Sequence, residues 1–161
     1  MTEQRATETS TSDLMQKLLL EVQRFDRMTA DEIGINATDL LCLVWVERAE
    51  QPVSAKALSG FLGISTGSTT ALIDRLEKRK LLKRARHPTD RRGITLKPGP
   101  AVARPEIVAV RAQYRNLMTQ AWSGFSEAEL LVVQRFLLAT IAAMGEQIGA
   151  DTVPSARAQD E

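Results

Sequence analysis

The sequence predicts a mainly α-helical protein with one small β-hairpin. Apolar residues recur at three- and four-residue intervals in several segments, which is the spacing of one helix face. The apolar residues, 43% of the chain, are mostly Leu, Ala, Val and Ile, and aromatic residues are only 4%, a composition that suits helices. Pro and Gly punctuate these segments, and 161 residues are enough to bury a core.

Two helices are predicted in the N-terminal part of the chain, over residues 12–31 and 37–49. The first has an apolar face made of Leu14, Leu18, Val22 and Phe25. The second has Asn36 as its expected N-cap and Asp39 in its first turn, where the helix dipole favours an acid. Because the second helix is apolar nearly all round, it is expected to be central and buried.

Residues 54–97 are predicted to form two more helices and then a hairpin. Ser54 caps a helix that ends near residue 62, and after a Gly-containing turn Ser65 caps a helix that ends near residue 79. Pro88 and Gly93 punctuate the turn between two strand candidates, residues 81–86 and 93–96. This order is that of a helix-turn-helix followed by a wing, an arrangement typical of DNA binding.

Two long helices are predicted after the break at residues 98–100. The first fits residues 105–125, since Pro105 is acceptable in a first turn. Ser126 and Glu129 match a capping box, so the last helix begins near residue 127. It carries a seam suited to packing on another helix, formed by Leu130, Val133, Leu137, Ile141, Met144 and Ile148.

These elements predict a winged helix-turn-helix domain over residues 36–100. Residues 12–35 and 101–151 are expected to form a helical dimerisation region, because their apolar stripes need a partner in the same chain or in a second copy. Residues 1–11 and 152–161 are polar and patternless, and are expected to be disordered tails.

The charge is unevenly distributed along the chain. Residues 54–97 hold eleven Lys or Arg and three Asp or Glu, a net charge of +8, which leaves −7 for the rest of a chain of net charge +1. A basic module on an acidic scaffold would orient towards a polyanion without sticking to it all over.

Short hydroxyl residues begin the helix that Ser65 caps. Such a helix end can enter a major groove, and its side chains and amides can contact phosphates or base edges; the candidates are Ser65, Thr66, Ser68 and Thr70. The alternative is a surface helix whose first residues are Ser and Thr without further role.

The basic hairpin supplies the other candidate DNA contacts. Arg91 and Arg92 at its tip can reach a minor groove, with Asp90 pairing to one of them to support the tip. Backbone contacts are expected from Arg84 or Arg86 on the strand, and from Lys56 and Arg75. The alternative is a solvated cluster of charges.

No pattern in the sequence points to an enzyme, a metal site or another cofactor. The chain lacks a Gly-rich phosphate loop, an HExxH motif and a CxxC motif. The single histidine, His87, is expected to be a wing residue rather than a pH switch or ligand. The single cysteine, Cys42, lies between two leucines and is expected to be inert core rather than a redox sensor.

Residues 64–84 resemble the recognition helix and first wing strand of the MarR family, and residues 88–92, Pro-Thr-Asp-Arg-Arg, resemble that family's wing signature. The resemblance covers most of the chain. Two departures concern the wing: the chain after Arg92 is shorter by a residue or two, and Lys80 stands where Gly is usual. A positive φ at Lys80 would carry a modest strain.

The resemblance implies a homodimeric regulator whose N- and C-terminal helices interlock. It also implies a small apolar or aromatic ligand between the dimerisation and DNA-binding regions. Residues that could line such a pocket, or be ordinary core instead, are Met28, Trp45, Tyr114, Met118 and Trp122.

The function expected from the sequence is therefore transcriptional regulation through a pseudo-palindromic double-stranded operator, by a repressor that a ligand releases. The alternatives are a winged-helix module for protein–protein contact and a DNA-binding protein without a ligand. No segment has the roughly 18 uninterrupted apolar residues that a membrane span needs, and a cytoplasmic location is expected.

Overall fold

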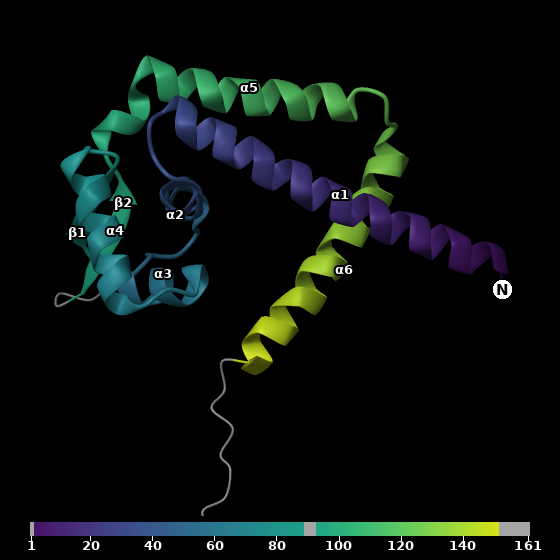
Figure 1. Cartoon of the computed structure of the whole chain (residues 1–161), viewed down its shortest axis with the longest axis horizontal. Helices are drawn as coiled ribbons and strands as arrows, with labels where there is room; N and C mark the ends of the chain where they lie inside the picture. The colour runs from purple at the N-terminus through teal and green to yellow at the C-terminus, as the bar shows by residue number, and fades with distance from the viewer. Residues whose placement is uncertain (1, 89–92, 152–161) are drawn as a thin grey trace, which may run out of the picture. The chain divides into compact units, whose positions relative to one another are not determined.

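A computed structural model describes residues 2–88 and 93–151. The chain divides into two compact units, residues 1–112 and 113–161, which are described separately. Figure 1 shows its elements, which are α1 (Thr2–Glu32), α2 (Ala37–Arg48), α3 (Ala55–Leu62), α4 (Thr66–Lys78), β1 (Leu82–Arg86), β2 (Ile94–Pro98), the short 3₁₀ helix η1 (Pro100–Ala103), α5 (Pro105–Trp122) and α6 (Glu127–Asp151). The predicted class, mainly helical with one hairpin, is confirmed.

The core of the first unit lies between α2, α3, α4 and the hairpin. Its most deeply buried apolar side chains are Cys42, Leu58, Ile73, Leu76, Leu81 and Leu82. Removal of such a side chain from water contributes about 1.5–3 kcal/mol to folding. The buried side chains of α4 therefore attach this helix to the core, and its outer face remains exposed to solvent.

Each N-cap expected from the sequence is present. The side-chain oxygens of Asn36, Ser54 and Ser65 accept the backbone N–H three residues on, at 2.8, 3.1 and 3.1 Å. Before α6, the Ser126 backbone N–H donates to Glu129 Oε2 at 2.8 Å and the Glu129 N–H donates to Ser126 Oγ at 3.4 Å. This reciprocal pair is the predicted capping box.

The first helix is longer than expected. α1 begins at Thr2, so the prediction of a disordered tail over residues 1–11 is wrong for residues 2–11. The added segment contains Glu, Gln, Ala and Arg, which are good helix formers, and extending an existing helix avoids the cost of a new nucleus. An apolar pattern was therefore not needed there. The other predicted tail, residues 152–161, lies outside the described residues.

The residue Val53, in the loop before α3, pairs with the hairpin, which the sequence did not predict. β1 and β2 are antiparallel, with Arg86 opposite Ile94. Val53 forms an isolated antiparallel bridge with Leu96, and its carbonyl accepts both the Leu96 N–H at 2.8 Å and the Thr95 hydroxyl at 3.1 Å. The loop before α3 therefore anchors the hairpin to the core.

The turn after α4 has a positive φ at Lys80, the conformation considered in the sequence analysis. Lys80 has φ +59°, and the N–H groups of Lys80 and Leu81 donate to the carbonyls of Glu77 and Leu76 at 2.8 and 3.0 Å. This is a Schellman cap with Lys in the position that usually holds Gly. Gly99 lies against the turn: a Cβ at Gly99 would be 2.8 Å from the carbonyl carbon of Lys80.

We expect Gly99→Ala to lower the free energy of unfolding by about 2 kcal/mol, because the added methyl meets rigid backbone. Gly99 has φ −87°, so the effect is steric rather than conformational. Urea denaturation measures it. Gly60→Ala is the matched control, since a Cβ there meets nothing within 4 Å and Ala favours the helix. Equal stabilities of Gly99→Ala and the wild type would show that the Lys80 turn can move aside.

Candidate nucleic-acid interface

The outer face of α4 is polar, small and exposed. Thr69, Leu72, Ile73 and Leu76 are buried against the core. The other side exposes Thr66, Gly67, Thr70 and Ala71 in its first two turns. Side chains of this size let a helix backbone approach base edges closely, and the methyl groups of Thr and Ala can contact the methyl of thymine. β1 lies beside α4, and β2 pairs with β1 on the hairpin (Figure 1).

The hydroxyls at the start of α4 differ in what they can still bind. Ser65 Oγ donates to Ser68 Oγ at 2.9 Å in addition to capping the helix, so Ser65 is committed to the cap. Thr70 Oγ1 donates its only hydrogen to the Thr66 carbonyl at 2.9 Å. The Thr70 hydroxyl can therefore only accept a hydrogen bond from a base. The exposed hydroxyls of Thr66 and Ser68 can instead donate a hydrogen bond to a phosphate.

Arg75 is tied to the core rather than free in solution. Its Nε donates to Asp39 Oδ2 at 2.9 Å and its Nη2 to Asp39 Oδ1 at 2.5 Å. The Asp39 side chain is 2% exposed, whereas that of Arg75 is 47% exposed. The hydrogen bond to Asp39 raises the pKa of Arg75. Arg75, expected from the sequence to contact the DNA backbone, thus fastens α4 to the first turn of α2.

Arg84 is also engaged within the protein. Its guanidinium pairs with Asp74 at 2.8 Å and with Glu77, and its backbone N–H donates to Glu77 Oε1 at 2.9 Å. The hydrogen bond to Asp74 is the main cause of its raised pKa. Arg84 therefore joins β1 to α4 and offsets one of the two negative charges of Asp74 and Glu77, which would otherwise repel a phosphate backbone.

Other basic side chains of the module are exposed to solvent. Lys56 on α3 and Arg86 on β1, both expected as contacts, are exposed. Sequence reasoning missed Lys83 and Lys97, which lie directly opposite each other on the hairpin. Like charges in that position repel, so the pair favours a bound anion. Only the strand register shows this pair, since the two residues are far apart in sequence.

The hairpin tip is largely outside the described residues. Asp90, Arg91 and Arg92 lie there, so their predicted roles stay predictions. The described ends of the tip are joined by a hydrogen bond from the His87 N–H to the Gly93 carbonyl at 2.9 Å. Arg86 and Ile94 are the last paired strand residues before it.

The five residues predicted to line a ligand pocket fall in different units. Met28 and Trp45 belong to the first unit, and Tyr114, Met118 and Trp122 belong to the second. Trp45 stacks on Phe61, with ring centroids 4.4 Å apart and an angle of 6° between the planes. Trp45 also borders a shallow depression lined by residues 49–53 and Ala57. A ligand pocket formed by the five residues stays a prediction.

Cys42 is buried in the core, as the sequence predicted. Burial and the charge of Asp39 raise the pKa of the thiol to about 12. The thiolate, which is the reactive form, is therefore strongly disfavoured at neutral pH.

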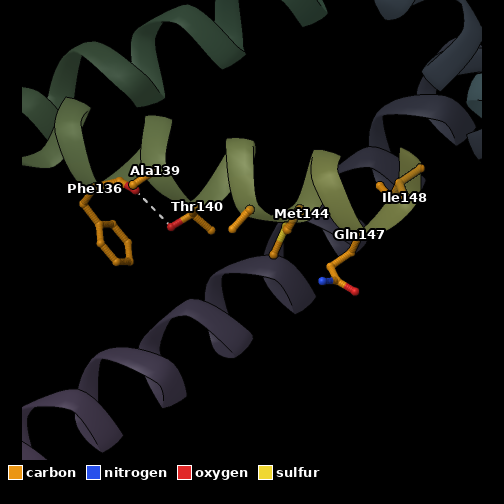
Figure 2. A pocket seen from close by; sticks show the side chains of 7 residues that line it. Phe136, Ala139, Thr140, Met144, Gln147 and Ile148 are labelled. Atoms are coloured by element: carbon orange, nitrogen blue, oxygen red, sulfur yellow. Dashed lines mark hydrogen bonds between the residues drawn. The ribbon is translucent and has the colours of Figure 1, made fainter. Parts of the chain in front are cut away.

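The second unit exposes an apolar helix. Figure 2 shows Phe136, Thr140, Met144 and Ile148 along one side of α6. Leu137 and Ile141 are also 41% and 65% exposed. By length and composition alone, Glu127–Ile148 could also cross a membrane, with a mean hydropathy of 1.5. Arg135 within it weakens that reading, because an Arg at the centre of a span costs about 2.5–3.5 kcal/mol.

Comparison with known proteins agrees with this architecture. A family model described as MarR family matches residues 33–93. The HTH-type transcriptional regulator YcgE of Bacillus subtilis (strain 168) is 38% identical over 85 residues, which cover 53% of this chain and 54% of that protein. The chain thus spans about half the length of the curated relatives it matches.

Solved structures share the fold over more of the chain. A MarR family protein from Bacillus stearothermophilus superposes with a TM-score of 0.68 at 20% identity, covering 88% of this chain and 97% of that one. CouR from Rhodococcus jostii RHA1, solved with p-coumaroyl-CoA bound, gives 0.57 at 19% identity, covering 80% and 89%. The chain therefore has a winged helix-turn-helix fold like that of solved MarR family proteins, and its residues 33–93 match the model of that family.

Proposed function

We propose that the protein is a homodimeric, sequence-specific regulator that binds double-stranded DNA. The observation that carries this proposal is the outer face of α4, which combines a capped N-terminus with small polar side chains beside a basic hairpin. Exposed amides at the N-terminus of a helix bind phosphate, and small side chains let the helix enter the major groove. The protein acts in the cytoplasm, as the sequence predicts.

The second partner in the proposal is another copy of the chain. The apolar residues of α6 are exposed in the single chain on more than one side of the helix, at Leu131, Val133, Leu137 and Ile141 among others. A helix of this kind needs a large apolar partner. Because each copy supplies one α4 helix, an operator with two half-sites about 10 bp apart fits the proposed dimer.

The regulator is proposed to be a repressor that a small aromatic or apolar ligand releases. The ligand would favour a dimer geometry in which the two α4 helices no longer match one turn of DNA. CouR supports the proposal of a ligand, because it shares the fold of this chain and its structure holds p-coumaroyl-CoA. A panel of simple phenols and aromatic carboxylates tests the idea, with operator affinity as the readout. If no member of the panel lowers that affinity, the ligand-independent alternative is favoured.

The proposal is tested by titrating the protein onto a fluorescent duplex from upstream of its own gene, at two salt concentrations, with a scrambled duplex as the control. Selective binding that weakens steeply with salt is expected, because bound lysines and arginines release counterions from the phosphates. The rival function, a winged-helix module for an acidic protein partner, predicts neither selectivity nor a steep salt dependence on DNA.

Arg91→Ala is expected to weaken binding to all sequences and to reduce the salt slope by about one unit, because one phosphate contact is lost. The measurement is the slope of log affinity against log salt concentration. Lys17→Ala is a charge-matched control, since Lys17 lies on the exposed part of α1 outside the basic module. An unchanged slope for Arg91→Ala would remove Arg91 from the contact surface.

A further inference from the structure

The C-terminal end of α4 holds the end of α1. The Arg79 guanidinium donates through Nη2 to the Ile33 carbonyl at 3.0 Å and through Nη1 to the Gly34 carbonyl. Both acceptors directly follow the last residue of α1, Glu32. One side chain of the α4 cap therefore satisfies two carbonyls at the C-terminus of another helix, where a cation is also favoured by the helix dipole.

The end of α1 is shaped to receive this side chain. Gly34 has φ +66°, and the N–H groups of Gly34 and Ile35 donate to Asp31 and Ala30 carbonyls at 3.0 and 2.9 Å. This Schellman cap fixes the direction of the Ile33 and Gly34 carbonyls. A Cβ added at Gly34 would lie 3.6 Å from Arg79 Nη2, so the guanidinium lies beside the Gly34 backbone.

The same turn of α4 also holds the chain that leads into α5. The Lys80 carbonyl accepts the Ala101 N–H at 2.9 Å, and the Leu81 carbonyl accepts the Gly99 N–H at 2.9 Å. Both donors lie between β2 and α5. Three consecutive residues, Arg79–Leu81, thus connect the end of α4 with the end of α1 and with the chain just before α5.

We propose that Arg79 is a positioning residue for DNA recognition, because it sets the orientation of α4 relative to α1. This inference rests on the proposed function, in which α1 and α5 lead to the dimer contacts and α4 enters the major groove. In such a dimer the angle between α4 and α1 decides the distance and relative rotation of the two α4 helices. Loss of the Arg79 contacts leaves α4 attached to its core but lets the angle between α4 and α1 vary. The dimer then also binds operators whose half-sites are too far apart.

The experiment measures how strictly the dimer reads half-site spacing. A duplex is selected from a random-sequence library with the wild-type protein, and copies are made with one or two base pairs inserted between the half-sites. Two added base pairs move the half-sites apart by about 7 Å and rotate them by roughly 70°. The wild type should bind the two-base-pair insertion at least about tenfold more weakly than the selected duplex.

Arg79→Ala should reduce this spacing penalty at least about threefold, while binding to a single half-site stays within about twofold of the wild type. Lys78→Ala is the matched control, because Lys78 is the exposed neighbouring cation on the last turn of α4. A lost phosphate contact or a general loss of stability lowers affinity for all duplexes alike and leaves the penalty unchanged. Arg79→Lys, which keeps a cationic donor, should restore most of the penalty.

Two results would overturn the inference in different ways. A wild-type spacing penalty in Arg79→Ala shows that Arg79 does not set the orientation, while the proposed function stands. If the wild type selects no sequence, the proposed function fails first and this inference with it. Circular dichroism checks that Arg79→Ala is folded; if it is not, Arg79→Gln takes its place, and its penalty must also shrink.

Discussion

Leu137→Asp should convert the proposed dimer to monomers. Leu137 is 41% exposed in the single chain, in the middle of the apolar seam of α6, and is expected to be covered by the second copy. A carboxylate buried there without a partner costs several kcal/mol, and about 4 kcal/mol weakens association roughly a thousandfold. Sedimentation velocity at micromolar concentration measures the change. Operator affinity should fall with it, because two linked half-site contacts become single ones.

The matched control for this change is Arg135→Asp. Residues two apart on a helix point about 200° away from each other, so the same acidic side chain is placed on the other side of α6. That variant should remain dimeric if the seam through Leu137 is the contact. A Leu137→Asp protein that still sediments as a dimer would show that this side of α6 is not the interface, and the apolar side chain of Phe136 would be tested next.

Arg75→Ala should lower the free energy of unfolding by about 2–3 kcal/mol, because the buried Asp39 carboxylate loses its charged partner. The expected cost lies below that of a fully buried pair, since half of the Arg75 side chain is in water and solvent screens its charge. Urea denaturation of both proteins gives the difference. DNA binding should also weaken, because the pair fastens α4 to α2.

Asp39→Ala should cost less than Arg75→Ala, because it removes the buried charge and leaves a guanidinium that water can solvate. Lys78→Ala, a loss of positive charge one turn further along α4, should change stability by no more than about 0.5 kcal/mol. A double-mutant cycle over Asp39 and Arg75 then isolates the energy of the pair. If Arg75→Ala unfolds at the wild-type urea concentration but loses a salt-dependent contact with DNA, the role expected from the sequence is the correct one.

The sequence was a good guide wherever the cause is local. Asn36, Ser54 and Ser65 cap helices because a side-chain oxygen reaches an N–H only three residues away. The buried stripe of α4 follows from its 3.6-residue period. The same local reasoning placed Asp39 as an acid in a first helix turn, which is where it lies.

The sequence did not show which charges pair with each other through the fold. The pair of Arg75 with Asp39 was missed because the two residues are 36 apart in the chain, and the predicted phosphate contact of Arg75 stays a prediction. Arg84 looked free for the same reason, although Asp74 and Glu77 on α4 already hold it. Lys83 and Lys97 attracted no attention until the strand register placed them opposite each other.

The sequence by itself determined the order of the helices, their caps, the hairpin and the basic character of the module, because these depend on periodicity, local hydrogen bonds and charge count. Only the tertiary structure decided which basic residues hold the protein together and which remain available to a polyanion. Ion pairs such as Asp39–Arg75 and contacts such as Arg79 with the end of α1 form between residues far apart in the chain. Their geometry exists only once the core has packed, and no local pattern encodes it.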